Sequence, residues 1–307
     1  MKKKKPSATQ TADTKSTLVS TPPAPRQTAP GSPAASLSPA TNSLPAIDTA
    51  KLDEQLQELR LPTIREHHAQ TADHAAREHW THTRFLAELT DRECQTRIQN
   101  RVLRLLRNSR LLPGKTWNQF QWKRLPLHVV RQFETLRCGS FLDHQTNILV
   151  FGNPGSGKTN LLCLLGDELA RQGRSVLFTT CQLLVQDLLK AKRDLNLARS
   201  IRSLAKFEAL IIDDLGYVQQ SREEMEVLFT LLAERYERGS VLLSSNLPFS
   251  QWEQIFKDPM TTAAAIDRLI HHSVVIELNI PSFRLDAAKE NRKSKADSPT
   301  SKTGSTS

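Results

Sequence analysis

The segment FGNPGSGKTN at residues 151–160 constrains the fold and the chemistry of this chain more than any other stretch. It fits the pattern Gly-x-x-x-x-Gly-Lys-Thr, in which Lys158 and Thr159 follow the second fixed glycine. In such a loop, backbone N–H groups surround phosphate oxygens, the lysine reaches the β and γ phosphates, and the threonine hydroxyl ligates Mg²⁺. We therefore expect a nucleotide-phosphate site made of Gly152, Asn153, Pro154, Gly155, Ser156, Gly157, Lys158, Thr159 and Asn160.

The residues around this loop predict its structural setting. An apolar run at 147–151 is typical of a buried strand, and leucines recur at helical spacing from 161 to 169. Further apolar runs alternate with helical stretches along the rest of the chain, at 175–180, 209–213, 241–245 and 273–278. This alternation predicts an α/β fold with a parallel central sheet.

Composition divides the chain into five parts. Residues 1–50 are rich in Pro, Ser, Thr and Ala, and 286–307 are polar, so we expect both to be disordered tails. A helical pattern without strand signals at 51–112 predicts a small all-helical N-terminal domain, whose longest helix should run from 85 to 112. Residues 113–146 should form a linker or hinge, and 147–285 the α/β domain.

The distribution of charge favours a polyanionic partner only in part. The formal net charge is +10, but residues 1–50 carry six basic against two acidic residues (+4), and 286–307 carry five against three (+2). The folded part is therefore only moderately basic. We expect a cytoplasmic protein, because the sequence has neither a secretory signal nor a membrane-spanning stretch, and its four cysteines are widely spaced.

Two adjacent carboxylates follow the apolar run at 209–213. Asp213 is expected to hold Mg²⁺, and Asp214 to orient the water that attacks the γ-phosphate. The alternative is that the strand simply ends in a polar turn. Asp214 is one methylene shorter than the glutamate common at this place, so hydrolysis could be slow or could need Glu223, Glu224 or a partner.

Two further residues are candidates for catalysis. Asn246 follows the next strand and could hydrogen-bond both the γ-phosphate and the attacking water, although a turn-forming asparagine would look the same. Arg268 is the only arginine of the helical segment 261–271. It could reach a neighbouring subunit's nucleotide, or form a salt bridge with Asp267 or another acid.

These residues lie in blocks through which the chain resembles a known family. It is similar to the IstB/DnaC-like group of AAA+ ATPases, and more closely to IstB-like helpers of insertion-sequence transposition, over about 52–284. The blocks are LRLPTIREHH (59–68), FLAEL (85–89), GNPGSGKT (152–159), LIIDDLGY (210–217), LLAERYERGSVLLSSN (231–246), PFSQWEQIFKDP (248–259) and AAAIDRLIHHSVVIEL (263–278).

The resemblance implies a P-loop AAA+ three-layer domain with the AAA+ strand order, ATP as the nucleotide and Mg²⁺ as its metal. Arg268 would act in trans, so that nucleotide sites lie between the subunits of a homo-oligomer. Family members assemble on duplex DNA, bend it and present it to a partner (IstA-like) transposase. Hydrolysis, expected to be stimulated by DNA, would then dismantle the assembly.

A basic stretch after the second predicted strand offers physical support for DNA binding. Its residues are Lys190, Lys192, Arg193, Arg199 and Arg202. Contacts from such side chains to phosphates give affinity without sequence choice, although a solvated pair of charged helices has the same composition.

Other functions remain open from the sequence. A helicase loader would share the ATPase blocks, and a nucleotide-gated binding module with negligible turnover would explain Asp214. The polar sequence soon after 278 leaves little material for a full helical lid. Arg284 is a weak candidate for a second sensor arginine.

Overall fold

The structure is a computed structural model that describes residues 48–114, 116–216, 221–252 and 259–283. The chain divides into two compact units, Met1–Thr49 and Ala50–Ser307. The predictions made for the two tails and for Arg284 lie outside the described residues. The helices and strands lie in the second unit, apart from the first residue of the first helix, Thr49.

The centre of this unit is a five-stranded parallel sheet in the order β2-β3-β4-β1-β5. Its strands are β1 (Asn147–Gly152), β2 (Val176–Thr180), β3 (Ala209–Leu215), β4 (Ser240–Ser245) and β5 (Ser273–Leu278). All five predicted strands are therefore confirmed to within two residues at each end. The position of β1, which carries the glycine-rich loop, between β4 and β5 is the AAA+ order that the resemblance implied.

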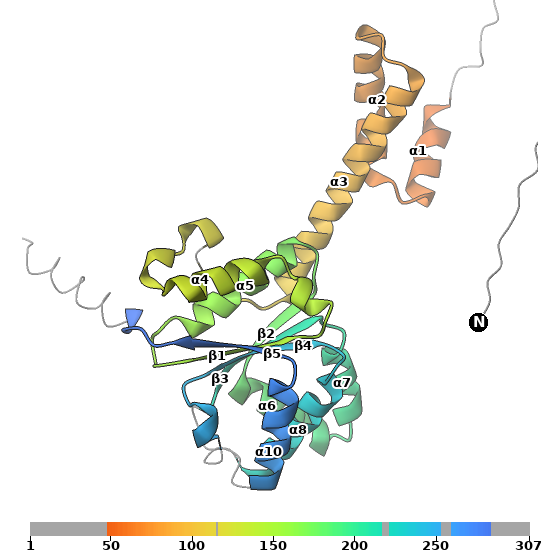
Figure 1. Ribbon diagram of the computed structural model, residues 1–307. Coiled ribbons are helices and arrows are strands. Elements are labelled where there is room, and N and C mark those ends of the chain that lie inside the picture. Colours follow the sequence, from red (N-terminus) through yellow and green to blue (C-terminus); the bar gives the residue numbers. More distant parts are fainter. Residues whose placement is uncertain (1–47, 115, 217–220, 253–258, 284–307) are drawn as a thin grey trace, which may run out of the picture. The chain divides into compact units, whose positions relative to one another are not determined.

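Helices cover both faces of the sheet, as Figure 1 shows. One face carries α4 (Leu127–Arg137) and α5 (Lys158–Arg171), and the other carries α6 (Cys181–Arg193), α8 (Arg222–Arg235) and α10 (Pro259–Ile270). Two shorter elements are α7 (Leu197–Leu204), which follows α6, and the 3-10 turn η4 (Phe249–Gln251). The molecule thus has the three layers of a P-loop AAA+ domain.

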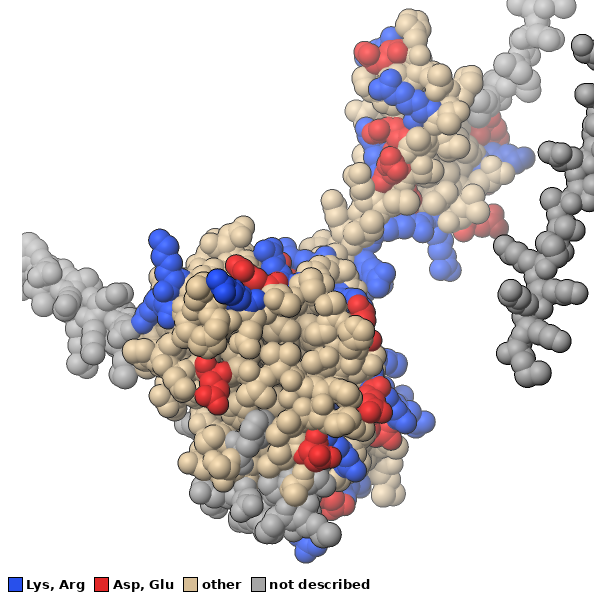
Figure 2. Space-filling model, in the orientation of Figure 1, with Lys and Arg blue, Asp and Glu red and all other residues tan. Residues whose placement is uncertain are grey.

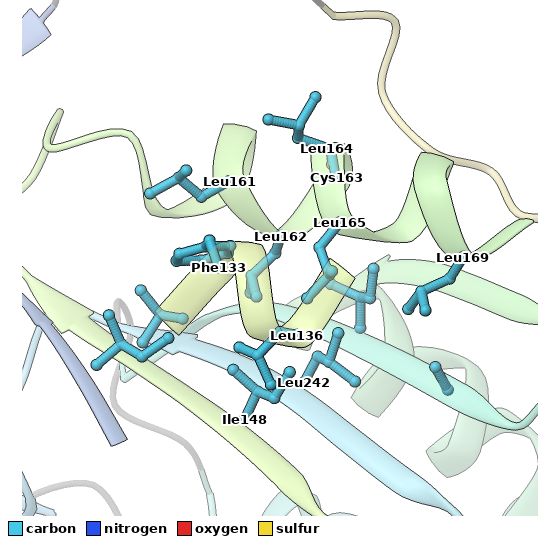
Figure 3. Close-up of a cluster of buried hydrophobic side chains, with 14 of the residues drawn as sticks. Phe133, Leu136, Ile148, Leu161, Leu162, Cys163, Leu164, Leu165, Leu169 and Leu242 are labelled. Carbon is cyan, nitrogen blue, oxygen red and sulfur yellow. The ribbon is translucent and has the colours of Figure 1, made fainter. Parts of the chain in front are cut away.

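Successive side chains of β1 point alternately to the two faces of the sheet and pack against the helices on each face. Ile148 belongs to the apolar cluster beneath α4 and α5, whereas Leu149 belongs to the cluster on the α6 and α8 side. Figure 3 shows Leu162 and Leu165 of α5 reaching from their helix towards the strand residues Ile148 and Leu242. Because both faces are buried, the strand is apolar throughout and shows no period of two in its sequence. This packing fixes the end of β1 and the start of α5, and hence the loop between them.

One buried arginine accounts for much of the ERYERGS block. Arg235 is 3% exposed and donates to the carbonyl oxygens of Leu204, Phe207, Glu208 and Ser240. Burial lowers its pKa to about 10, so the side chain remains charged at neutral pH. Gly239 lies against it, and a Cβ there would come within 2.7 Å of the guanidinium. The block therefore anchors the ends of α7, β3 and β4, and its role is structural.

The first helices of the unit are α1 (Thr49–Glu58), α2 (Pro62–Arg77) and α3 (His82–Asn108). Glu93 of α3 is buried and accepts the N–H groups of Thr63 and Ile64, so it caps the start of α2. Burial opposes its charge, but the hydrogen bonds from Arg97 and from these two N–H groups keep the pKa of Glu93 below its usual value. Arg97 is thereby part of this cap, which explains one member of the row of arginines on α3.

The longest helix differs from its prediction of 85–112. It starts earlier because Thr81 accepts the N–H of Arg84 as an N-cap, and it ends earlier because Arg110 adopts a left-handed conformation (φ 54°). The carbonyl of Ser109 then accepts the N–H of Phe178 in β2. The chain leaves α3 directly against the edge strand of the sheet.

Three 3-10 turns surround α4, η1 (Trp117–Gln119) and η2 (Trp122–Arg124) before it and η3 (Ser140–Leu142) after it. Trp122 of this region makes tilted ring contacts with both Trp117 and Phe133, and all three pack in the apolar cluster beneath α5. The segment predicted as a hinge therefore contributes to the core. No helix among the described residues is long and apolar enough to cross a membrane. In the face that Figure 2 shows, basic and acidic side chains are interspersed, without a broad field of one sign.

Candidate nucleotide site

The glycine-rich loop joins β1 to α5 at the carboxyl edge of the sheet. Gly157, its last residue before the helix, has φ 91° and is the N-cap of α5, a conformation that a residue with a Cβ rarely adopts. Lys158 is 4% exposed, and its Nζ donates to the carbonyls of Gly152 (2.8 Å) and Asn153 (3.1 Å). The buried Ser156 Oγ has no hydrogen-bond partner among the described residues. The loop thus combines a left-handed glycine at the start of α5 with a lysine whose ammonium group is bonded to the carbonyls of the loop itself.

The expected partner acids lie beside the loop. Thr159 Oγ1 donates to both carboxylate oxygens of Asp213 at 2.9 Å, and Ser244 Oγ donates to Asp213 Oδ1 at 2.5 Å. Burial raises the pKa of the Asp213 carboxyl above its ordinary value; the hydrogen bond from Ser244 opposes this rise, and the charge of Asp214 adds to it. A buried carboxylate whose negative charge is disfavoured is well suited to a cation beside it.

Asp214 occupies an unusual backbone conformation. Its φ is 59°, at a register shift in the pairing of β3 with β4, and its side chain is exposed. The Asp214 N–H donates to Ser244 Oγ at 2.9 Å. Strained conformations of this kind cluster at functional sites. The bulge turns two consecutive acids to different environments, one buried and one exposed.

Sequence reasoning selected Asn246 at the tip of β4 and missed Ser244. Asn246 Oδ1 accepts from Lys158 Nζ at 2.5 Å, so the structure brings it to the loop. Ser244 is fully buried and touches both Asp213 and Asp214. The signal for it was present, since β4 is an apolar strand that ends in two serines, both of which are fully buried.

A segment after β5 lies on the loop and was also missed. The Phe283 N–H donates to the carbonyl of Gly155 at 2.9 Å. A Cβ on Gly155 (φ 80°) would lie 2.1 Å from Ser282 Oγ, so this glycine is required by the close approach. The guanidinium of Arg124 stacks over the Phe283 ring at 4.1 Å. No apolar pattern marks so short a segment, and only its position after the last strand could have suggested the contact.

A cavity of about 770 Å³ adjoins the loop. Its lining includes Gly157 and Asn160 of the loop, Cys163 of α5, and the Arg124 and Phe283 pair. The lining also includes polar side chains such as Asp167 and Arg171, and concave sites with stacking and polar groups commonly hold small ligands. Glu224, considered above as a catalytic acid, instead accepts the N–H of Ser221 in a capping box at the start of α8.

Arg268 lies apart from this network. Its guanidinium stacks over Phe229 of α8 at 4.8 Å, and its Nη1 is buried without a hydrogen-bond partner among the described residues. The described residues give it no salt bridge to Asp267. The side chain would have to leave Phe229 to reach a nucleotide in another subunit.

The basic stretch predicted for DNA contact folds as α6, a tight turn and α7. The side chains of Lys190, Arg193, Arg199 and Arg202 are exposed, and none forms a salt bridge within the described ranges. Lys192 differs because it pairs with Glu226 of α8 at 2.9 Å. Four of the five predicted positions therefore present an uncompensated positive charge.

The chain is similar to several known proteins. The family model described as "IstB-like ATP binding protein" matches residues 54–292. An insertion sequence ATP-binding protein of Sinorhizobium fredii is 42% identical over 80% of this chain and 82% of its own length. The insertion sequence IS21 ATP-binding protein of Pseudomonas aeruginosa is 33% identical over 79% and 91%. Among solved structures, AMPPCP-bound DnaA from Aquifex aeolicus is similar with a TM-score of 0.48 at 17% identity, over 60% of this chain and 56% of that one.

Proposed function

Because the chain belongs to the IstB-like ATP-binding proteins of insertion sequences, we propose that it is an ATPase that assembles on duplex target DNA for a partner transposase. ATP binding would build the assembly, and hydrolysis would dismantle it. The observation that carries the proposal is the hydrogen-bonded set of Thr159, Asp213 and Ser244 beside the loop that holds Lys158. This set supplies the metal ligands that phosphoryl transfer requires beside a phosphate-binding loop.

The residues present fit Mg²⁺. Thr159 and Asp213 offer the hard oxygen ligands that this ion prefers, and they already touch at 2.9 Å. When bound, Mg²⁺ supplies charge neutralisation for the terminal phosphates. Ser244 holds Asp213 in place through a hydrogen bond.

The chain's own polar groups would then act on the γ-phosphate. Asp214 would accept a proton from the attacking water, and Asn246 would orient that water. Lys158 would exchange its hydrogen bonds to the carbonyls of Gly152 and Asn153 for contacts with the β and γ phosphates. The adenine ring of ATP would enter the 770 Å³ cavity, whose lining includes Phe283 and Arg124.

Assembly between subunits would complete the site. We propose that Arg268 leaves Phe229 and contacts the nucleotide of a neighbouring copy, which would satisfy its orphaned Nη1. The uncompensated charges of α6 and α7 would contact DNA phosphates. Bending duplex DNA costs several kcal/mol, which ATP-dependent assembly of several subunits could supply.

The decisive experiment measures phosphate release and particle mass, with ATP against ADP, on duplex and on single-stranded DNA. Duplex-stimulated release with ATP-dependent assemblies would support the proposal. Stimulation by single strands alone would favour a helicase loader. ATP binding without turnover or assembly would leave a nucleotide-gated binding module.

Arg268→Ala tests the arrangement between subunits. A transition-state arginine is worth about 10³-fold or more in turnover, so we expect hydrolysis to be lost while the isolated chain still binds ATP. Arg238→Ala is the matched control, because Arg238 is exposed and pairs with Glu234. Wild-type hydrolysis in Arg268→Ala would refute a role in trans.

A further inference from the structure

The turn between α6 and α7 carries a leucine at its tip. Leu195 is 93% exposed, the highest value of any large apolar side chain among the described residues. The Asn196 N–H donates to the carbonyl of Ala191 at 2.7 Å, and the Leu195 N–H donates to that of Lys192 at 3.2 Å. This pair of bonds is a Schellman motif, and it places Leu195 in the left-handed region with φ 55°.

Within the described residues, no packing contact accounts for a leucine here. Glycine or asparagine is usual at this place in the motif, because a Cβ is strained there. The apolar sides of the two helices are already filled by Leu188 (1% exposed) and Ile201 (6% exposed). A left-handed residue with a Cβ is strained, and strain of this kind is found most often at functional sites.

The charges around the tip define what it could bind. Lys190 and Arg193 end α6, Arg199 and Arg202 lie on α7, and all four are exposed without a salt bridge in the described part of the chain. Asp194 is the only acid between Lys190 and Arg202. An apolar tip flanked by free cations complements a ligand whose interior is apolar and whose rims are anionic. Duplex DNA, with stacked bases between two rows of phosphates, has this character.

We propose that Leu195 is a wedge that enters a base step of duplex DNA from the minor groove, while the flanking cations hold the phosphates. Apolar side chains inserted in this way partly unstack a step and kink the duplex. The inference rests on the proposed function and adds to it the residue that produces the bend. Such insertion does not require a particular base sequence, which suits a protein that accepts many target sites.

The test is DNA bending by the full chain with ATP. The probe is a duplex of about 40 base pairs with a dye at each end, much shorter than the persistence length of about 150 base pairs, so that energy transfer reports a kink. We expect Leu195→Ala to lose more than half of the change in energy transfer and about tenfold in affinity. Its dependence on salt should stay that of the wild type, because the phosphate contacts remain. Leu127→Ala, which removes another exposed leucine (64%), should bend as the wild type does.

Two further measurements separate the wedge from a folding defect. Leu195→Gly should raise the melting temperature, because glycine relaxes the left-handed turn, and yet should bend no better than Leu195→Ala. A duplex with a central bulge is kinked beforehand and should restore the affinity of Leu195→Ala.

The outcomes distinguish failure of the proposed function from failure of the wedge alone. If the wild-type chain does not bind duplex DNA, the proposed function fails and the wedge with it. If the wild type bends DNA and Leu195→Ala bends it equally, only the wedge is overturned. Unchanged bending together with lost binding of a transposase would also overturn it, and would make Leu195 a contact for a protein.

Discussion

At the carboxyl edge of the sheet, Thr159, Asp213 and Ser244 are joined to one another by hydrogen bonds, whereas at the α6–α7 turn Lys190 and Arg199 are exposed without a salt bridge among the described residues. The first region is a set of polar groups satisfied inside the chain and arranged before any ligand arrives. The second is a set of groups whose partners must come from outside. The difference shows where the chain already holds its binding geometry and where a large ligand must complete it.

That difference has consequences for substitution. A preorganised site loses its function when any member is removed, because the remaining groups lose their orientation. Exposed cations act nearly independently, each through one phosphate. The variants below should therefore show large and specific losses in the first region and small, graded ones in the second.

Lys158→Ala should have the largest effect. The ammonium group lies in the loop, where it donates to the carbonyls of Gly152 and Asn153. Charge-assisted contacts to phosphate are strong, and we expect ATP affinity to fall by about 100-fold or more. Calorimetric titration with ATP measures this, with the exposed Lys51→Ala as the control. Retained tight ATP binding would show that the loop is not a phosphate site.

Ser244→Ala should have a more selective effect. The hydroxyl orients Asp213 and accepts the N–H of Asp214, but it makes no contact with Lys158 in the hydrogen bonds observed. Loss of an outer partner of a metal ligand costs about 10–100-fold in activity, so turnover should fall by this factor while ATP binding persists. Ser203→Ala, which removes an exposed hydroxyl on α7, is the control. Equal turnover in the two variants would show that hydrolysis does not depend on the hydrogen bonds of Ser244.

For the first region, the sequence predicted the residues of the loop but not all of their partners. The loop and Asp213 follow from the fixed spacing of a motif and from the end of an apolar strand, both of which are local signals. Ser282 and Phe283 could not be found, and the serines that end β4 could not be connected to Asp213, because these contacts arise from β5 lying beside β1 and β4 lying beside β3. The order of strands in a sheet is set by packing over the whole domain, and no short window of sequence contains it.

Backbone conformation was the second thing that the sequence concealed. The left-handed residues Asp214 and Leu195 have φ near 59° and 55°, and neither is a type that favours this region as strongly as glycine. A reader of the sequence places aspartate in a turn and leucine in a core. Both assignments miss what the strain indicates about function.

Arg199→Ala should lower duplex affinity only several-fold. One phosphate contact contributes one increment of counterion release, so the salt dependence should weaken by about 1 in its logarithmic slope. Lys192→Ala is the matched control on the same surface, because Lys192 is already paired with Glu226. We expect its effect to be the smaller of the two, measured by fluorescence anisotropy at several salt concentrations. Equal effects would mean that the pair opens on DNA and that the two regions differ less than the free chain suggests.

The reactivities of Cys163 and Cys138 give the smallest expected effect, and they test whether ATP fills a site that is already formed. Burial beside the nucleotide cavity raises the pKa of Cys163 to about 11, whereas a hydrogen bond from Ser140 lowers the pKa of the exposed Cys138. The thiolate is the reactive form, and its fraction grows as pH rises, so at pH 8 iodoacetamide should modify Cys138 at least about tenfold faster than Cys163. Raising the pH should narrow the gap, and ATP should slow Cys163 alone, because only Cys163 lines the cavity. Peptide mass spectrometry over time measures both rates. If ATP slowed the two cysteines equally, it would be tightening the whole domain rather than filling a site prepared for it.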